Sequence, residues 1–589
     1  MNSQWRLLFL SLFFALIPFL LLARLFYWQI LASEKLTELA ESQQLTTLEI
    51  AAKRGDILTS DASFLITNQP AYFAYLIRNP EKPFPQDLAV KLAPYIYSSI
   101  SYSATPSSFL SFTDKKHLIQ QTEDIILKRL ADERLAWIPL ARKLTEQQKW
   151  VLEGLGISHI FFEEDQNRLY PEASMAAHLV GFVGQDEQGR DVGYHGLEGF
   201  YQQELAGRPG IIRQEKDAFN QPIIMGEYLQ QQTKDGRSLQ LHLDKSLQYL
   251  VEKKLQKGID QFGAKAGSVA VMDPHTGAIL AMASLPGYDP IEYARYQESL
   301  YLNPIVSDAF EPGSIFKVII MSAALDTDSV KPDTKCDICD GPLKIDKYTI
   351  KTWDDKYYPD SNITDIIVRS NNVGMVFVGQ KLGLDKFLDY FKKFGFTELT
   401  GIDLQDEIIP PPRPDQQWTY VDLATASFGQ GFVATGMQLL QAVSAIANGG
   451  QLIQPQVVHQ VIGDRQITIP AKVKHRVISP ETAKTITGMM VAAAKEGEAK
   501  WTAKKGYQIA GKTGTAQIAV GGKYAEEKTN ASFIGFAPAD NPKFTMLVTL
   551  KEPSTSQWAS ETAAPLWFSI AQDLLNHFNV IPSGNWDIV

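Results

Sequence analysis

The sequence predicts a multi-domain α+β protein: an N-terminal membrane helix, an elongated domain of mixed α/β structure, and a C-terminal domain in which an antiparallel sheet packs against helices. Three observations lead to this prediction. The chain has 589 residues, more than one hydrophobic core normally supports. It opens with a long uncharged apolar run, and its C-terminal part begins and ends in strand pairs with helical segments between them.

Residues 7–28 are predicted to form a transmembrane anchor. The stretch "LLFLSLFFALIPFLLLA" at 7–23 carries no charge, and a span needs about 20 apolar residues. Aromatic residues stand at both of its ends, as they do at membrane interfaces. The alternative is a signal peptide cut after Ala32, but the apolar part of a signal peptide is only about 7–15 residues long. We expect a single-pass protein with residues 1–6 as a short cytoplasmic tail and the bulk of the chain on the far side.

The pattern of the sequence changes near residue 235, where we place a domain boundary. Residues 29–235 mix short strands with helical runs, and their loops are rich in Gly, Pro and Asn. Beyond them lies a hairpin, "GSVAVMD" and "AILAMAS" around the turn "PHTG", and a second hairpin pairs "ASFIGFA" with "FTMLVTL". Strands at both ends of residues 236–575 predict one antiparallel sheet covered by helices. Residues 576–589 are predicted to form a C-terminal tail.

Composition argues against several classes of function. The net charge is −10 and no long basic run occurs, so nucleic acid is not an expected partner. The nine histidines are scattered, and neither a metal site nor a cofactor is predicted. Cys336 and Cys339 in "CDIC" are expected to form a local disulfide, because a metal site needs further ligands and a redox pair needs a βαβ setting.

Residues 310–325, "FEPGSIFKVIIMSAAL", place a serine and a lysine at the start of an apolar helix. Ser314 follows a Pro-Gly step and Lys317 stands three positions later, so the two side chains share a helix face. The first turn of a helix also favours developing negative charge. Ser314 can therefore act as a nucleophile with Lys317 as its base.

This role requires a lysine that is neutral near pH 7. A free lysine titrates near 10.4, so only about 0.04% of it is neutral at that pH. Burial and a nearby second cation both lower the pKa of a lysine. The apolar helix supplies burial for Lys317, and the second cation must come from elsewhere in the chain.

Two further motifs complete a recognisable set. "IIVRSNNVGM" contains Ser370 and Asn372, and "YQIAGKTGTAQIAV" contains Lys512 and the Thr-Gly-Thr run that follows it. Together with Ser314-x-x-Lys317, and in this order, they resemble the motifs of the penicillin-recognising serine enzymes.

The resemblance assigns a role to each residue of these motifs. Lys512 is the second cation, Ser370 relays a proton between Lys317 and the leaving amine, and Asn372 holds the amide backbone of the substrate. The N–H groups of Ser314 and Thr515 form an oxyanion hole. The hydroxyls of Thr513 and Thr515 bind a terminal carboxylate, and Gly514 lets a substrate strand approach closely.

Longer stretches resemble one branch of this group. "VMDPHTGAILAMASLPGYDP" and "ASFIGFAPADNPKF" are similar to the transpeptidase domain of class B penicillin-binding proteins, and "RGDIL" and "GLEGFYQQELAGRPG" are similar to their pedestal (dimerisation-type) domain. The resemblance implies a D,D-transpeptidase anchored in the bacterial cell membrane. Such an enzyme forms an acyl-enzyme from a D-Ala-D-Ala stem peptide, releases D-Ala and passes the acyl group to the amine of a neighbouring stem. β-Lactams acylate the same serine.

Within class B, "SNNVGM" and "FEPGS" are more similar to the septal cell-division type than to the elongation type. This resemblance implies a SEDS-type membrane glycosyltransferase and other division proteins as partners. The pedestal motif departs from its family at "TSDASF", which lacks the glycine of the expected turn. "GQGFVA" at 429–434 imitates a dinucleotide fingerprint, but without a βαβ unit it predicts a tight turn.

Two alternatives to a transpeptidase stay open. A D,D-carboxypeptidase or a β-lactamase-like hydrolase uses the same acyl-enzyme and lets water complete the reaction. A catalytically idle scaffold would bind and activate a glycosyltransferase.

Overall fold

The computed structural model of the chain separates into two compact units, which are described in turn. One unit joins Met1–Arg54 to Ala206–Gly236, and the other joins Gly55–Leu205 to Arg237–Val589. The structure describes residues 3–37, 45–78, 83–100, 115–132, 135, 137–157, 159–187, 189–215, 228–411, 413–502, 506–520 and 523–582. Parts of both predicted tails, residues 1–2 and 583–589, lie outside the described residues.

The first unit begins with a helix long and apolar enough to cross a membrane. Helix α1 (Ser3–Phe26) passes into a short π-helical segment, η1 (Tyr27–Leu31). The apolar span Leu8–Leu31 has a mean hydropathy of 2.4 and is not buried by the rest of the described protein. This helix is consistent with the predicted single-pass anchor at 7–28.

The same unit contains a three-stranded antiparallel sheet. Its strands are β1 (Leu45–Ile50), β8 (Gly210–Glu215) and β9 (Tyr228–Gln231), in the order β1-β8-β9. Residue Ile212 in the central strand lies opposite Leu48 on one side and Gln230 on the other.

A seven-stranded sheet organises the N-terminal part of the second unit. The strand order is β19-β18-β10-β2-β3-β4, and β5 pairs with β3. The strands are β2 (Ile57–Leu58), β3 (Phe64–Ile77), β4 (Trp137–Leu144), β5 (Ile160–Leu169), β10 (Ser238–Leu241), β18 (Val458–Ile462) and β19 (Gln466–Thr468). The β18–β19 hairpin comes from far along the chain and joins this sheet through β10. The sheet therefore contains strands from both sides of residue 235. The domain boundary near that residue stays a prediction.

Helices cover one side of β3 and β4. They are α3 (Leu88–Ile100), α4 (Lys115–Ala131) and α5 (Glu146–Gly154), and they share an apolar core with these strands. Arg168 on β5 donates from Nε to the Glu198 carboxylate over 2.8 Å in the interior. Removing one partner of such a buried pair leaves an uncompensated charge, so the pair holds β5 to the segment that follows.

The turn between β2 and β3 forms without its expected glycine. Ala62 takes the left-handed conformation, with φ of 63°, where glycine would fit at no steric cost. The Asp61 carboxylate accepts hydrogen bonds from the Ser63 N–H and hydroxyl, and Thr59 N–H donates to the Ser63 carbonyl over 2.9 Å. These bonds compensate for the strained alanine.

The C-terminal part of the second unit is built on a five-stranded antiparallel sheet. Its order is β12-β11-β23-β22-β21. The strands are β11 (Ala266–Met272), β12 (Ile279–Leu285), β21 (Ala510–Val520), β22 (Lys523–Ala537) and β23 (Phe544–Lys551). Both predicted hairpins, β11–β12 and β22–β23, are confirmed.

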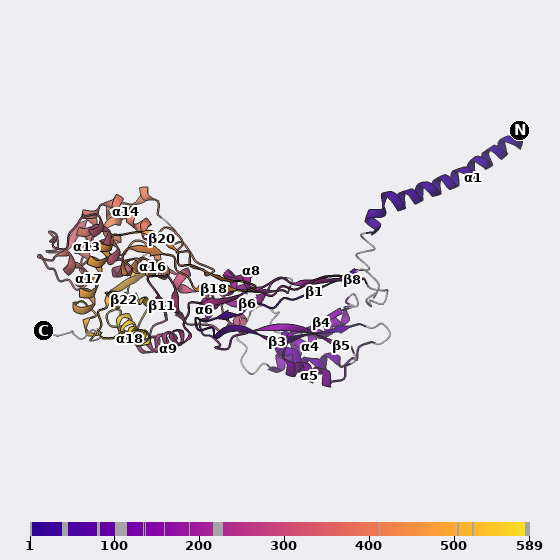
Figure 1. Ribbon diagram of the computed structural model, residues 1–589, viewed down its shortest axis with the longest axis horizontal. Coiled ribbons are helices and arrows are strands. Elements are labelled where there is room, and N and C mark those ends of the chain that lie inside the picture. The colour runs from indigo at the N-terminus through magenta and orange to yellow at the C-terminus, as the bar shows by residue number, and fades with distance from the viewer. Residues whose placement is uncertain are drawn as a thin grey trace. The chain divides into compact units, whose positions relative to one another are not determined.

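Helices cover both faces of this sheet, as the alternating apolar pattern requires (Figure 1). On β11, Val269 and Val271 face helices α9 (Lys245–Phe262) and α18 (Ala563–His577). The intervening Ala270 and Met272 belong to the core on the opposite face, because successive strand residues point to opposite sides. The prediction of an antiparallel sheet packed against helices is confirmed.

The core on that opposite face is mainly helical. It is formed by α11 (Lys317–Asp326), α12 (Ile363–Val368), α13 (Asn372–Leu382), α14 (Leu384–Lys393), α15 (Tyr420–Ala426), α16 (Gly436–Ala447) and α17 (Pro480–Glu496). Among these, α11 is buried on all sides, so its polar residues are held away from water.

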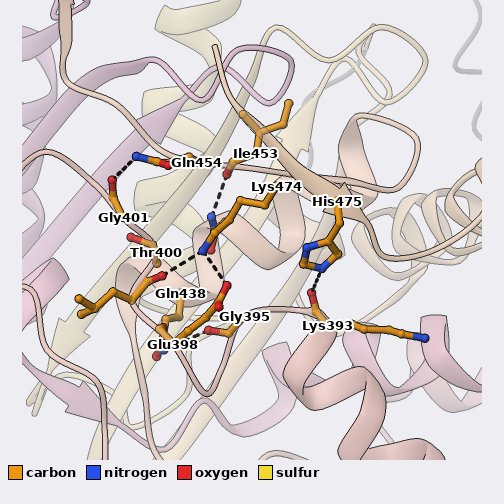
Figure 2. A network of polar contacts seen from close by, with 12 residues as sticks. Lys393, Gly395, Glu398, Thr400, Gly401, Gln438, Ile453, Gln454, Lys474 and His475 are labelled. Atoms are coloured by element: carbon orange, nitrogen blue, oxygen red, sulfur yellow. Dashed lines mark hydrogen bonds and ion pairs between the residues drawn. The ribbon is translucent and has the colours of Figure 1, made fainter. Parts of the chain in front are cut away.

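The loop after α14 is fixed by side chains of α16, of Gln454, which follows strand β17 (Gln451–Ile453), and of strand β20 (Val473–Arg476), as Figure 2 shows. Gln438 donates to the carbonyl oxygens of Gly395 and Glu398, and Lys474 lies 2.7 Å from the Glu398 carboxylate. Since buried backbone carbonyls need a partner, these bonds hold the end of α14 against the rest of the domain.

Candidate active site

Ser314 lies in a 3₁₀ turn, η6 (Gly313–Phe316), which leads directly into α11 at Lys317. The Pro-Gly step does precede a helix start, as predicted, although the first turn is tighter than an α-helix. A 3₁₀ turn has about three residues per turn, so positions three apart still lie one above the other. Ser314 and Lys317 therefore lie on adjacent turns of one continuous helical segment.

Two glycines allow other backbone segments to close around this turn. Gly429, with φ of 87°, accepts a hydrogen bond from Gly313 N–H over 2.9 Å. A Cβ added at Gly429 would lie 2.0 Å from the Gly313 carbonyl oxygen. The predicted tight turn at 429–434 is thus present, and it serves as a backbone support for the segment that carries Ser314.

Gly514 provides a second close approach. A Cβ added there would lie 2.8 Å from Ile315 Cγ2 and 3.1 Å from the Pro312 carbonyl oxygen. By its resemblance to the family, Gly514 was expected to make room for a substrate strand. In the structure, the space left by its missing side chain is filled by the turn that holds Ser314.

Lys317 is fully buried, and its Nζ is hydrogen-bonded at the base of the site. It donates to the Ser370 carbonyl over 2.6 Å, to Asn372 Oδ1 over 2.7 Å, and to Ser370 Oγ over 3.2 Å. Within the described part of the chain, these bonds link Lys317 to the middle motif and none goes to Ser314 Oγ. Burial lowers the pKa of Lys317 well below its usual range, the charge of Lys512 lowers it further, and the charge of Glu498 opposes both.

The middle motif joins α12 to α13 in a strained backbone conformation. Ser370 is buried and has φ of 54°, a left-handed value that non-glycine residues adopt at an energetic cost. Asn371 caps α13 by accepting from Gly374 N–H over 2.9 Å. Asn372 was expected to hold the substrate amide, but here its Oδ1 binds Lys317 and its Nδ2 donates to the Lys351 carbonyl over 3.0 Å.

The third motif lies on β21, which is an edge strand of the five-stranded sheet. Lys512 is buried, and its Nζ donates to Thr513 Oγ1 over 3.1 Å. Burial lowers the pKa of Lys512, and Glu498 raises it. Thr513 donates in turn to Glu498 Oε2 over 2.9 Å, and Thr515 Oγ1 accepts from Ala559 N–H over 3.0 Å.

The motifs meet at one cavity of about 80 Å³. Its lining residues are Gly313, Ser314, Trp353, Ser370, Asn372, Phe428, Gln430, Glu498, Thr513, Thr515, Trp558 and Ser560. Lys317 and Lys512 are buried beside this cavity, where they bond to its lining residues Ser370 and Thr513, respectively. A serine nucleophile, a buried lysine of lowered pKa and a set of hydroxyl and N–H groups can carry out acyl transfer.

Several of these lining residues could not be predicted from the sequence. Trp353 and Trp558 come from separate loops and pack edge to face, with ring centroids 5.4 Å apart. Glu498 stands between α17 and a short 3₁₀ segment, η8 (Lys500–Thr502), outside any motif. None of the three has a spacing or neighbour in the sequence that would connect it to Ser314.

Two family models together match most of the chain. Residues 267–576 match the penicillin binding protein transpeptidase domain, and residues 49–241 match the penicillin-binding protein dimerisation domain. Among curated relatives, the stage V sporulation protein D of Bacillus subtilis is 31% identical over 592 residues, which covers 98% of this chain and 87% of that protein. The peptidoglycan D,D-transpeptidase FtsI of Escherichia coli is 28% identical over 455 residues, 77% of this chain and 74% of that protein.

A solved structure is similar over nearly the same length. The crystal structure of penicillin binding protein 3 from Mycobacterium tuberculosis, complexed with aztreonam, superposes with a TM-score of 0.67 at 25% sequence identity. The match covers 91% of this chain and 98% of that one.

Proposed function

The chain belongs to the penicillin-binding protein transpeptidase family, and on this premise we propose that Ser314 carries the acyl group during peptidoglycan cross-linking. The family assignment makes it a penicillin-binding D,D-transpeptidase of peptidoglycan synthesis. The observation that supports the roles of individual residues is the meeting of Ser314, Ser370 and Thr513 at one cavity beside two buried lysines.

In the first step, the D-Ala-D-Ala end of a stem peptide acylates Ser314. Neutral Lys317 takes the hydroxyl proton, and Ser314 Oγ bonds to the carbonyl carbon of the penultimate D-Ala. The proton passes from Lys317 through Ser370, whose hydroxyl is 3.2 Å from Nζ, to the leaving nitrogen. The peptide C–N bond breaks, and D-Ala leaves.

In the second step, the amine of a neighbouring stem attacks the ester carbonyl. The C–O bond to Ser314 breaks as the new amide forms, and the amine proton returns through Lys317 to Ser314 Oγ. Both steps need the neutral form of Lys317, and burial together with the charge of Lys512 supplies it by lowering the pKa of Lys317. The N–H groups of Ser314 and Thr515 stabilise the oxyanion.

β-Lactams acylate the same serine in this proposal. The related M. tuberculosis protein has been crystallised with aztreonam and with ampicillin. Acylation of Ser314 opens the lactam ring by breaking its C–N bond, and the nitrogen stays attached to the acyl-enzyme. The blocked serine can then no longer accept a stem peptide.

The cellular role that we propose is septal wall synthesis at the bacterial cell membrane, with α1 as the anchor and the bulk of the chain outside the cytoplasm. The motifs "SNNVGM" and "FEPGS" and the similarity to FtsI support it. A SEDS-type glycosyltransferase and other division proteins are the expected partners. Depletion of the protein should give filamentous cells without septa. Swollen round cells would contradict a septal role, and so would a defect confined to sporulation, which the name of the B. subtilis relative implies.

Labelling with a fluorescent penicillin tests the site. The wild type should be labelled covalently, Ser314→Ala should not, and Lys317→Ala should react more slowly by about 10³-fold or more, because the proton transfer loses its base. Labelling that persists in Ser314→Ala would refute the assignment.

Incubation with lipid-linked precursor and a partner polymerase tests the reaction. Mass analysis should show cross-linked stem dimers together with released D-Ala. Release of D-Ala without dimers would instead indicate a carboxypeptidase. Normal division supported by Ser314→Ala would indicate a scaffold.

A further inference from the structure

A second cavity, with a volume of about 330 Å³, is lined by none of the residues of the acyl-transfer motifs. Its size lies within the range of small-molecule binding sites, which begins at about 300 Å³. Its wall combines aromatic rings with a few charged side chains, the composition typical of such sites. The proposed function leaves this cavity without a role.

The second cavity lies beside the one that contains Ser314. Two backbone segments run together here: Gly313 N–H donates to the Gly429 carbonyl over 2.9 Å, and Gly431 N–H donates to Glu311 Oε1 over 3.0 Å. Gly313 lines the serine cavity, whereas Glu311 and Gly431 line the second one. Glu311 precedes Ser314 by three residues, so their Cα atoms are at most about 11 Å apart. A molecule that reacts at Ser314 can therefore reach the second cavity.

The positive charges of the second cavity are already neutralised. Lys392 lies 2.6 Å from the Asp415 carboxylate, and Arg413 forms an ion pair with Asp422. The remaining charged residue of the lining is Glu311. The cavity therefore has a negative charge that comes from Glu311.

The Glu311 carboxylate is hydrogen-bonded to neutral groups. Its Oε1 accepts from Gly431 N–H and from the Tyr524 hydroxyl, each over 3.0 Å, and Tyr524 also lies 3.1 Å from Oε2. Among the described residues, no lysine, arginine or histidine forms an ion pair with it. Burial raises the pKa of Glu311, although the bonds from Gly431 and Tyr524 lower it. A partly buried carboxylate without a cationic partner favours a cationic ligand.

Four aromatic residues form a wall of this cavity: Phe391, Phe396, Trp418 and Phe432. The ring centroid of Phe391 lies 5.2 Å from that of Phe396 and 5.2 Å from that of Phe432. The Arg413 guanidinium lies 5.3 Å from the ring centroid of Trp418, so this wall already holds one cation. Aromatic faces attract cations and also pack against alkyl chains. Together with a carboxylate, they fit a primary ammonium group on an aliphatic stem.

We propose that the second cavity binds the acyl acceptor: Glu311 pairs with the ammonium group of the neighbouring stem peptide, and the aromatic wall holds the aliphatic stem that carries this group. This inference rests on the proposed transpeptidation at Ser314 and adds the acceptor side of the reaction. The bound ammonium gives up one proton to solvent, and the neutral amine attacks the ester carbonyl with Lys317 as the base. Capture by Glu311 thus favours attack by the amine over attack by water.

The fate of the acyl-enzyme tests this proposal. Ser314 is acylated by a thioester of N-acetyl-D-alanine in the presence of an added nucleophile, and mass analysis gives the ratio of the amide product to the free acid. Both products come from the same acyl-enzyme, so the ratio does not depend on the rate of acylation. One nucleophile is Nα-acetyl-lysine amide, which carries an ammonium group at pH 7, and the other is a hydrazide of the same length, which is neutral. Ser314→Ala gives the uncatalysed background.

In Glu311→Gln, the ratio with the lysine-derived amine should fall about tenfold because the ion pair is lost, whereas the ratio with the hydrazide should stay within about twofold. Glutamine keeps the length of the side chain and an oxygen that can accept from Gly431. Glu311→Asp retains the charge and should recover part of the loss. Glu481→Gln, in the exposed first turn of α17 and outside both cavities, is the matched control for net charge and should change neither ratio.

Unchanged ratios in Glu311→Gln would overturn the inference, and so would an equal fall with both nucleophiles, which would indicate a structural role. The wild type provides a test that needs no variant. Nε-trimethyl-lysine amide is a cation that cannot attack, and it should lower the ratio with the lysine-derived amine more than the ratio with the hydrazide. Absence of this competition would also overturn the inference. Absence of penicillin labelling, or free acid as the sole product with both nucleophiles, would count against the proposed function instead.

Discussion

Gly429→Ala should slow acylation through the backbone alone, because Gly429 touches no substrate in the proposed reaction. Its φ of 87° costs an alanine about 1–2 kcal/mol. The larger effect comes from the new Cβ, which would lie 2.0 Å from the Gly313 carbonyl oxygen, a contact that real Cβ atoms keep above 3.0 Å. The backbone that carries Ser314 must therefore move by about 1 Å.

A displacement of about 1 Å near the reacting atoms can lower a rate about 100-fold, which corresponds to about 2.7 kcal/mol in the barrier. We therefore expect the second-order rate of acylation by a fluorescent penicillin to fall by about 100-fold in Gly429→Ala. The thermal midpoint should fall only modestly.

Gly449→Ala is the matched control. Gly449 has a similar φ of 82°, but a Cβ added there meets nothing within 4 Å. It should lose only the conformational cost of about 1–2 kcal/mol and keep the wild-type acylation rate. An acylation rate in Gly429→Ala within about threefold of the wild type would refute the argument that this glycine positions the serine turn.

Three further outcomes are expected. Lys512→Gln should shift the rise of penicillin acylation to higher pH, because the charge of Lys512 lowers the pKa of Lys317; a rate profile that does not move would contradict this coupling. Burial lowers the pKa of His178 from 6.5 to about 4, so the folded state resists its protonation. The contribution of His178 to stability should be complete above about pH 6.5 and should fall by up to about 3 kcal/mol as the pH drops to about 4. His178→Gln should flatten this part of an unfolding-against-pH curve, and a curve unchanged by the substitution would contradict it. Cys336 and Cys339 form the predicted disulfide. Because the closed loop is short, replacing both by serine should cost about 2 kcal/mol of stability and leave penicillin labelling intact. Loss of labelling at full stability would contradict a purely structural role.

Local patterns were sufficient for most of the architecture. The period of two in "GSVAVMD" and "FTMLVTL" identified strands, and the turn residues beside them identified the hairpins, because neighbouring residues in the sequence carry both signals. The long uncharged run at 7–23 likewise indicated a membrane helix. Ser314 and Lys317 could be expected on one helix face because three positions along a helical segment bring side chains near each other whatever else the chain does.

Contacts between distant segments could not be read in this way. Nothing in "VVHQVI" indicates that β18 joins β10 rather than another strand, and nothing near Glu498 indicates that it will face Thr513. Such contacts follow from which packed surfaces meet when the core closes, and that choice depends on the summed burial of many residues rather than on any short stretch. The residues of the acyl-transfer motifs could therefore be identified from the sequence. The pKa of Lys317 could not, because it depends on burial and on the charges of Lys512 and Glu498, which only the tertiary structure brings close.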